Sequence, residues 1–420
     1  MSEKTNSPQP DVVVVGGGAA GMLAALFSAR GGAQTLLLEK NEKLGKKIYI
    51  TGKGRCNLTN TAQNEDFFAQ VPRNPRFLRS AMSFFDAGSI VELVEANGTI
   101  TKVERGGRVF PESDKASDVT RALQRALERA GVEIRKNALV EEILPVEGGF
   151  QIRLPAEQIS CRAVVIATGE MSYPATGSTG DGYRFAERLG HTVTPLRPSL
   201  VGMNMAGTWH TLLQGLSLKN VRLVARQGKK LVYSQMGEML FTHFGISGPL
   251  VIELSSHLEF DKPAEVFVDL KPGMTEAELD ARLQREFEEN RRRQLGSVMG
   301  HLLPARMVPV LLRLAELSPE IPLSEVPREI RRKLGMTLKH LDLPVTGLRG
   351  MEEAIVTRGG VEVREIVPGT LMSKRLPGLF FAGEVLDVDA HTGGFNLQIA
   401  WSTGALAGAS AAAMALENGG

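Results

Sequence analysis

Three glycines near the N-terminus have the spacing of a phosphate-binding turn. The segment GGGAAG at 16–21 lies between a β-branched run at 12–15 and an alanine- and leucine-rich stretch at 19–30. Its GxGxxG pattern consists of Gly16, Gly18 and Gly21. Such glycines let the backbone approach a pyrophosphate, whose charge meets the free N–H groups that begin a helix. Glu39 ends a second predicted strand, where its carboxylate can bind ribose hydroxyls, so the segment predicts a dinucleotide site.

The C-terminal segment 378–404 decides between two dinucleotides. The GxGxxG motif fits FAD and NAD equally well. Here, however, a late predicted strand ends in Gly383-Glu384, and in flavoproteins with two dinucleotide folds a carboxylate at that place meets the ribityl chain. The last predicted helix opens with Gly393, Gly394, Phe395 and Asn396. Backbone donors and the helix dipole at that point favour an anionic reduced flavin, so we predict FAD.

Both ends of the chain are needed to build the sheet that positions these residues. Four short apolar runs are typical of buried parallel strands: 12–15, 35–39, 163–167 and 379–382. Helices are predicted at 19–30 and 396–416, which gives a βαβ unit at the N-terminus and a closing helix at the C-terminus.

The middle of the chain has a different character. Strand-like pieces precede helical ones there, and we find no second glycine-rich βαβ signature. We therefore predict an α/β protein with a discontinuous Rossmann-like FAD-binding domain of the two-dinucleotide-fold flavoprotein type, interrupted by an inserted mixed β-rich and helical domain. The expected parts are a disordered tail (1–10), the first part of the FAD-binding domain (11–194), the inserted substrate or cap domain (195–360) and the second part of the FAD-binding domain (361–420).

Five blocks, which together extend over nearly the whole chain, carry a family resemblance. They are GGGAAGM at 16–22, GKGRCNLTN at 52–60, ATGEMSYPATGSTGDGY at 167–183, GEMLFTHFGISGP at 237–249 and the C-terminal segment above. In these blocks the chain resembles the bacterial FAD-dependent flavoprotein family that groups a bile-acid 3-oxo-enoyl reductase (BaiN), an aminoacetone oxidase and a ribosomal RNA dihydrouridine synthase (RdsA).

The resemblance places the 52–60 block near the flavin ring, which makes Arg55, Cys56 and Asn57 candidate site residues. An arginine there can contact phosphate, a flavin carbonyl or an anionic substrate. Cys56 can be a catalytic proton donor to a substrate carbon, and it can equally be a small buried packing residue.

The resemblance makes the 167–183 block the second flavin-domain signature. Thr168 and Gly169 end a strand beside the cofactor. Glu170 stands where another glycine is expected, which questions the local loop shape but not the fold. Tyr173 can donate a hydrogen bond to substrate or simply pack.

Two histidines are further catalytic candidates. His243, next to Thr242, can donate a proton or orient a substrate carbonyl, or can cap its own loop. His391, beside the final glycines, has a similar claim. We expect no metal site, because neither histidine has neighbouring ligands at metal-binding spacing. The expected cofactor contacts also include Ala19, Ala20, Lys40, Lys47, Gly54 and Val140.

Because two of the family's three activities add a hydride and a proton to an activated C=C bond, we favour a reductase. NAD(P)H is the expected transient reductant, although a second GxGxxG motif is missing. The alternatives are a ribosomal RNA dihydrouridine synthase, a flavin amine oxidase of the aminoacetone oxidase type and a non-catalytic FAD-containing RNA-binding protein. The corresponding partners are a small enone or amine, or ribosomal RNA.

One feature favours RNA. Residues 281–340 contain 12 Lys or Arg against 7 Asp or Glu, a local charge of +5 in a chain of net charge +2. The densest runs are 291–293 and 331–333. Such a patch attracts phosphates, whereas the interleaved acidic residues are equally typical of a solvated helical face.

The composition of the chain argues against disulfide-rich, secreted and membrane-spanning classes of protein. The chain of 420 residues has 43% hydrophobic and 23% charged residues, as in ordinary globular proteins. Its two cysteines, Cys56 and Cys161, exclude a disulfide framework. The polar segment 1–10 does not have the composition of a signal peptide, and we find no run of about 18 apolar residues. We therefore expect a cytoplasmic protein without a membrane span.

Overall fold

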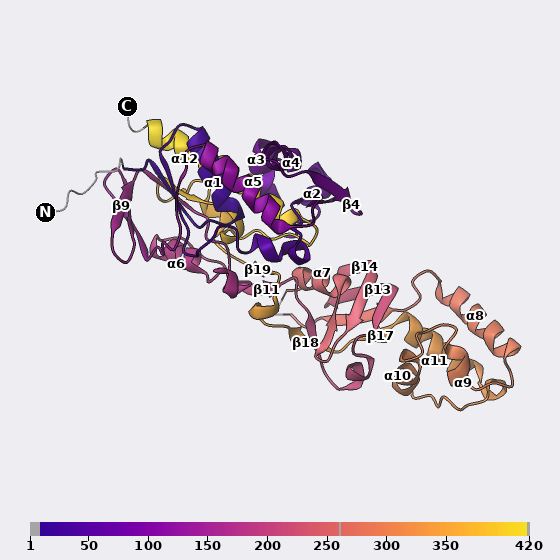
Figure 1. Ribbon diagram of the computed structural model, residues 1–420. Coiled ribbons are helices and arrows are strands. Elements are labelled where there is room, and N and C mark those ends of the chain that lie inside the picture. The colour runs from indigo at the N-terminus through magenta and orange to yellow at the C-terminus, as the bar shows by residue number, and fades with distance from the viewer. Residues whose placement is uncertain (1–8, 260–261, 418–420) are drawn as a thin grey trace. The chain divides into compact units, whose positions relative to one another are not determined.

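The computed structural model describes residues 9–259 and 262–417 (Figure 1). Two compact units form. The first combines 1–198 with 355–420, and the second consists of 199–354. Of the expected disordered tail at 1–10, residues 1–8 lie outside the described residues. Each unit has its own hydrophobic core.

A five-stranded parallel sheet is the centre of the first unit. Its order is β20-β10-β1-β2-β6, with bounds Leu379–Phe381, Ala163–Ile166, Val12–Val15, Thr35–Leu38 and Glu133–Arg135. Every residue of the first four of these strands is buried, which explains their unbroken apolar sequences. The sheet therefore joins strands from both ends of the chain, and the predicted Rossmann-type fold is confirmed.

Two helices of the first unit, one from each end of the chain, lie side by side (Figure 1). They are α1 (Ala19–Arg30) and α12 (Phe395–Glu417). A Cβ on Gly404 would overlap the carbonyl oxygen of Ala20, and one on Gly408 would overlap that of Ala24. The small residues of α12 therefore let the two backbones approach closely.

By length and composition alone, α12 could cross a membrane, although polar residues interrupt its apolar sequence. Of its most apolar 18-residue window, 72% is buried within the structure. Its alanines and glycines pack against α1 and the sheet, as in the core helix of a globular unit.

Smaller elements complete the first unit. The remaining helices are α2 (Asn64–Phe68), α3 (Arg79–Phe84), α4 (Ala87–Ala96), α5 (Ala116–Arg129) and α6 (Asp181–Arg188). One antiparallel sheet has the order β3-β5-β4 (Thr59–Asn60, Arg108–Pro111, Thr101–Glu104), and another has the order β7-β8-β9 (Glu142–Val146, Gly149–Arg153, Gln158–Cys161). Strands β11 (Arg197–Ser199) and β19 (Val356–Arg358) pair where the chain leaves and re-enters this unit.

The second unit has a seven-stranded sheet of order β17-β16-β13-β14-β15-β12-β18. In that order the strands are Leu341–Asp342, Glu265–Asp269, Ser217–Gln227, Lys230–Phe241, Gly245–Ser247, Met203–Met205 and Val345–Leu348. Its helices are α7 (Pro249–His257), α8 (Glu276–Glu289), α9 (Leu295–Met299), α10 (Met307–Leu314) and α11 (Arg328–Lys339). The long β13–β14 hairpin includes many polar residues that show little periodicity, and cross-strand pairing stabilises them.

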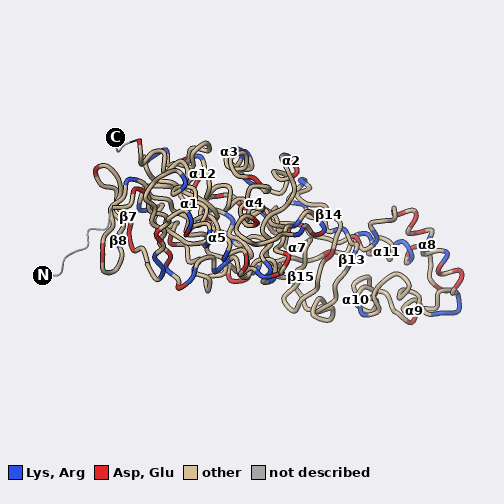
Figure 2. The backbone as a smooth tube through the Cα atoms, turned by 45° about the horizontal axis from the view of Figure 1, so that its top comes forward, with Lys and Arg blue, Asp and Glu red and all other residues tan. Residues whose placement is uncertain are grey.

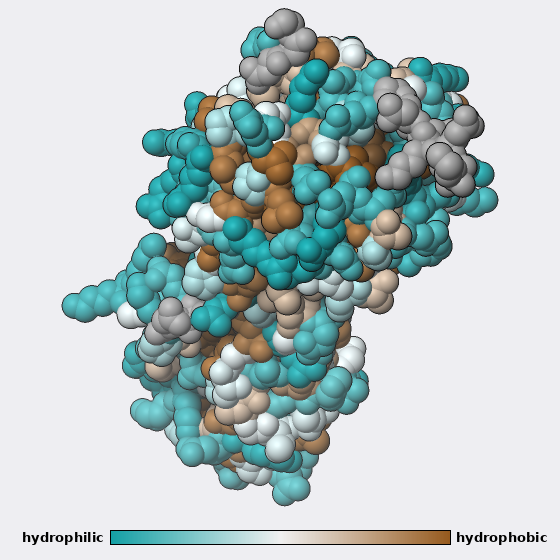
Figure 3. Space-filling model, turned by 90° about the vertical axis from the view of Figure 1, so that its left-hand side faces the viewer, coloured by the Kyte–Doolittle hydropathy of each residue, from teal (hydrophilic) through white to brown (hydrophobic). Residues whose placement is uncertain are grey.

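Much of the molecular face in Figure 3 is hydrophilic, with hydrophobic residues between the polar ones. The large hydrophobic side chains that are most exposed are Met336 of α11 and, around β4, Ile100 and Val103. Within both units, the described apolar residues lie mainly in the two cores.

Candidate functional site

A cavity of about 680 Å³ lies in the first unit. It is lined by the GxGxxG turn, the end of β2, the 52–57 loop, the loop after β10 and the segment that opens α12. All of these elements except the end of β2 belong to four of the five blocks found in the sequence. The carboxyl ends of parallel strands therefore converge on one cavity, as is usual for ligand sites in such sheets.

All but four of the predicted cofactor-binding residues line this cavity. Those that do are Gly16, Gly18, Ala19, Ala20, Glu39, Lys40, Lys47, Arg55, Asn57, Val140, Thr168, Gly169, Glu384, Gly393, Gly394 and Asn396. The remaining four, Gly21, Gly54, Gly383 and Phe395, are not among its lining residues. Of the three catalytic candidates, neither Cys56 nor His391 lines the cavity, and His243 belongs to the second unit.

The glycines of the GxGxxG turn are needed for different structural reasons. Gly16 has a φ of +107°, and a Cβ on Gly21 would overlap the carbonyl oxygen of Gly16, so both shape the turn itself. A Cβ on Gly18, by contrast, would meet nothing within 4 Å. Gly18 also caps α1 without a side-chain hydrogen bond, which leaves the first N–H groups of the helix available to a ligand.

Glu39 also lines the cavity, and hydrogen bonds hold its carboxylate in place. Its carboxylate accepts hydrogen bonds from the Gly17 backbone N–H (2.7 Å) and from the backbone N–H (2.7 Å) and side-chain amide (2.6 Å) of Asn41. Lys40 donates to Asp181 at 2.6 Å and so joins the end of β2 to the start of α6. The buried carboxylate of Glu39 is thereby held where it lines the cavity.

Residues far apart in sequence contact one another at the N-terminus of α12. The Gly394 N–H donates to the Asn57 side chain at 3.0 Å in the amide orientation that satisfies both Asn57 contacts. Asn60 donates to the Gly393 carbonyl oxygen at 2.9 Å. A Cβ on Gly394 would overlap the backbone of Thr59, so only glycine fits there. The 52–60 block therefore shapes the start of α12.

Arg55 is held by acidic and aromatic neighbours. Its guanidinium donates to Glu104 at 2.8 Å and to Asp114 at 3.3 Å. It also lies over the Phe110 ring, 4.0 Å from the centroid. These carboxylates raise the pKa of Arg55, so the side chain presents a fixed positive charge at the cavity wall.

Cys56 faces the protein interior. Its side chain is fully buried, and burial raises the pKa of the thiol to about 12. Its backbone has a φ of +64° and donates to the Thr51 carbonyl oxygen at 3.1 Å. This environment supports the packing alternative more than the proton-donor role.

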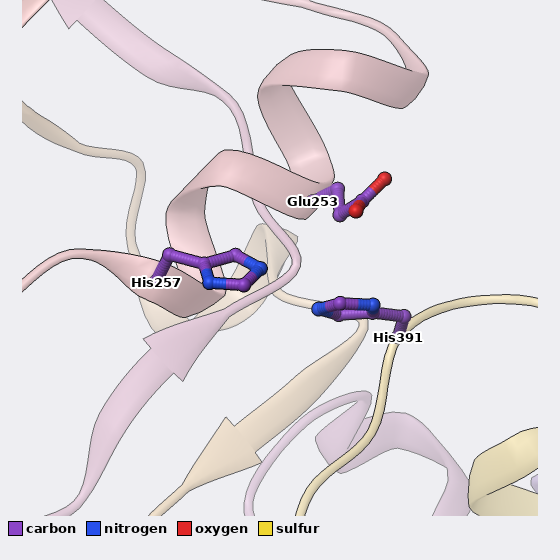
Figure 4. Close-up of side chains that lie close together, drawn as sticks. All are labelled: Glu253, His257 and His391. Carbon is purple, nitrogen blue, oxygen red and sulfur yellow. The ribbon is translucent and has the colours of Figure 1, made fainter. Parts of the chain in front are cut away.

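The histidine candidates lie in different units. His391 is buried, its backbone N–H donates to the Gln70 carbonyl oxygen at 2.9 Å, and it lies on the loop before Gly393 (Figure 4). His243 is exposed, and it is Thr242 that accepts the Gly245 N–H within that loop. Also in the second unit, His257 projects from α7 (Figure 4), with its ring 5.4 Å from that of Tyr233.

Three charged side chains form a buried network at the cavity wall. Lys47 bonds to Glu170, to the Ser172 hydroxyl (2.8 Å) and to Glu384 (3.0 Å). Glu170 also accepts from Ser172 and from the Thr357 backbone N–H. Glu170 is not among the described residues with a positive φ, so the expected glycine is not needed for the loop conformation.

The cavity has the features that a dinucleotide requires. At the end of β10, the buried Thr168 hydroxyl lines the cavity and has no hydrogen-bond partner among the described residues. Open space faces Gly18, free N–H groups begin α1, and Glu39 provides a carboxylate. These residues fit a dinucleotide such as FAD: the N-terminus of α1 would accept a pyrophosphate, and the Glu39 carboxylate would accept ribose hydroxyls.

Sequence reasoning missed several cavity residues. Asn41 follows the end of β2 by a few residues, and its position after a strand end could have identified it. Asp181 lies within the 167–183 block and begins α6, so its place in the block could have identified it. Phe110 carried no such signal, because its strand β5 belongs to a separate antiparallel sheet. Only the tertiary fold brings that ring to the cavity.

Comparisons with known proteins agree with this geometry. The family model of the HI0933-like protein Rossmann domain matches residues 10–410. The chain is 34% identical over 406 residues to a 3-dehydro-bile acid delta(4,6)-reductase of Clostridium scindens (95% of this chain, 98% of the relative). It is 32% identical over 394 residues to a ribosomal RNA dihydrouridine synthase of Escherichia coli (94% and 96%).

Among solved structures, a 3-ketosteroid-delta4-(5alpha)-dehydrogenase from Rhodococcus jostii aligns over 98% of this chain and 99% of its own, with 16% identity and a TM-score of 0.47. The family match extends over nearly all of the described residues and includes every element that lines the cavity. The chain therefore belongs to the HI0933-like family of Rossmann-fold, FAD-dependent oxidoreductases.

Proposed function

We propose that this protein binds FAD in the cavity of its first unit and reduces an activated C=C bond, with NAD(P)H as the source of electrons. The observation that carries the proposal is the convergence on one cavity of the GxGxxG turn, Glu39 and the glycines before α12. The two relatives named above also support it, since both of their named activities saturate a C=C bond conjugated to a carbonyl.

In this proposal different residues of the chain bind different parts of the cofactor. Gly18 and the first N–H groups of α1 bind the pyrophosphate, and Glu39 binds the adenosine ribose. Glu384 meets the ribityl chain, and the N–H groups near Gly393 face the ring. FAD supplies the capacity to accept and donate a hydride. The N-terminal dipole of α12, a helix of 23 residues, favours negative charge at the ring.

A ribosomal RNA dihydrouridine synthase is the second candidate. Two relatives with this name, 32% and 30% identical, favour it. In the second unit, Arg291, Arg292 and Arg293 are exposed on the turn after α8, where Figure 2 also marks acidic residues nearby. In the other basic run, Arg331 is bound by Asp280 (2.8 Å) and Lys333 by Glu316 (3.1 Å), which leaves less charge for RNA than the sequence suggested.

The test starts with the purified full-length chain. Flavin absorbance and mass spectrometry identify the cofactor, and NADH and NADPH are then offered without oxygen. Bleaching of the flavin by either nucleotide is expected. Its recovery is then followed with an α,β-unsaturated ketone, with ribosomal RNA fragments that contain uridine, or with oxygen alone.

Each result has a separate meaning. Recovery with the enone supports the small-molecule reductase. Recovery with RNA, together with dihydrouridine detected by mass spectrometry, supports the second candidate. Rapid recovery with oxygen and stoichiometric peroxide, but with neither acceptor, contradicts a reductase. A protein that retains no flavin contradicts the proposal altogether.

A further inference from the structure

Lys47 and Glu384 form a charged network with Glu170, a residue to which the proposed function assigns no contact with FAD. Lys47 and Glu384 line the cavity, whereas Glu170 lies behind them. The side chains of Lys47 and Glu384 are 20% and 23% exposed, and that of Glu170 is 1% exposed. The network therefore connects the cavity wall to a fully buried carboxyl group.

The network has two carboxyl groups for one ammonium group. When both are ionised it has a net charge of −1 in an environment of low polarity. Like charges that share a site disfavour simultaneous ionisation, so the pair tends to hold a proton. The more buried group has the larger desolvation penalty and is the better place for it.

The neighbours of Glu170 agree with this assignment. Burial and, secondly, Glu384 raise the pKa of Glu170 to about 7, although Lys47 and Ser172 oppose the shift. The same burial raises the pKa of Tyr183, which remains a neutral hydroxyl and donates to the Glu384 carbonyl oxygen at 3.3 Å. The Thr357 N–H is a further fixed donor to Glu170. Near neutral pH, the Glu170 carboxyl group can thus change its charge.

We propose that Glu170 is a positioning residue that gains a proton when negative charge appears in the cavity and releases it when that charge leaves. This inference rests on the proposed binding of FAD. Two electrons enter the cofactor from NAD(P)H as a hydride and add one negative charge. Solvent supplies the proton that converts the Glu170 carboxylate into the acid. On reoxidation the hydride would pass to one carbon of the activated C=C bond, and a separate proton from solvent would complete the saturated product. The added negative charge would then have left the cavity, and Glu170 would return its own proton to solvent.

The proposal predicts the pH dependence of the reduction potential. Each proton taken up with two electrons changes the potential by about 30 mV per pH unit. Spectroelectrochemical titration of the FAD-loaded full chain from about pH 6 to about pH 8 should therefore give a slope steeper for the native protein than for Glu170→Gln, by up to about 30 mV per pH unit. A residue with a merely structural role would leave the slope unchanged.

Two variants serve as controls. Glu187→Gln removes an exposed carboxyl group of α6 that does not line the cavity, and it should keep the native slope. Glu170→Gly introduces the residue expected at this position and should behave like Glu170→Gln, which keeps the test valid if Glu170→Gln does not fold. Equal slopes in native protein and a folded Glu170 variant that retains FAD overturn this inference alone. Failure of the native protein to retain FAD overturns the proposed function as well.

Discussion

At the scale of single residues, chemistry depends on how each polar group is held. Glu39 is bonded to Gly17 and Asn41, and Arg55 to Glu104 and Asp114. These groups are therefore fixed before any ligand arrives, which lowers the entropic cost of binding. Cys56, next to Arg55 in sequence, is buried in the core of the first unit and does not line the cavity.

Glu39 offers the most direct test of cofactor binding. Glu39→Gln should weaken FAD binding about ten- to a hundredfold, because charge-assisted hydrogen bonds contribute roughly 1.5–3 kcal/mol each. Titration of the flavin-free protein with FAD, followed by flavin fluorescence, measures this change. The matched control is Glu42→Gln, since Glu42 is exposed and outside the cavity lining, and it should bind FAD like the native protein. Equal affinities for all three proteins would exclude Glu39 from the cofactor site.

The two cysteines predict a chemical reactivity. Burial raises the pKa of Cys56 and of Cys161 to about 12, so at pH 8 both are protonated and shielded. We expect iodoacetamide to modify neither cysteine in the folded protein and both after denaturation, because the thiolate is the reactive form. Peptide mass spectrometry counts the modified sites. Rapid labelling of Cys56 in the folded protein would instead support its role as a reactive group at the flavin.

At the scale of elements, the contact between α1 and α12 holds the two ends of the chain together. The glycines of α12 face carbonyl oxygens of α1, so the contact tolerates no side chain at these positions. The same two helices present the GxGxxG turn and the Gly393-Gly394 pair at their N-termini. A change in their spacing would therefore alter both stability and the cavity.

Gly404→Ala and Gly408→Ala should each destabilise the first unit by about 1–3 kcal/mol. The added methyl group would overlap the backbone of α1, so relief of the overlap requires the two helices to move apart. The matched control is Gly335→Ala in the interior of α11, where a Cβ makes only an ordinary contact with Leu283. That control should stabilise the second unit by about 0.5–1 kcal/mol. The first unit contains Trp401 and the second contains Trp209, so the fluorescence of these tryptophans can follow denaturant unfolding of each unit. A stability gain in Gly404→Ala would contradict the close helix contact.

At the scale of the whole molecule, charge and binding chemistry are distributed over two units. The first contains the cavity, and the second contains the three consecutive exposed arginines. The net charge of +2 is small, so any affinity for RNA has to come from a local group of basic residues.

If ribosomal RNA is the substrate, the triple change Arg291→Ala, Arg292→Ala and Arg293→Ala should weaken RNA binding for all sequences alike. The dependence of log K on log salt should become shallower by about one for each lost phosphate contact. The control is the triple change Lys219→Ala, Lys229→Ala and Lys230→Ala, which removes the same charge from exposed positions around the β13–β14 hairpin. Filter binding at several salt concentrations measures both. Identical losses in the two variants would show only a general effect of charge.

The sequence by itself determined four of the five strands of the parallel sheet, the helices at 19–30 and 396–416 and the glycine turn. Each of these rests on local patterns: unbroken apolar runs, small-residue helices and the GxGxxG spacing. Tertiary structure alone decided that Asn60 binds Gly393, that Phe110 lies at the cavity and that Glu170 is paired with Lys47. These contacts join residues more than a hundred positions apart or elements of separate sheets. No local pattern in the sequence predicts these contacts, because they depend on how helices, strands and loops pack against one another.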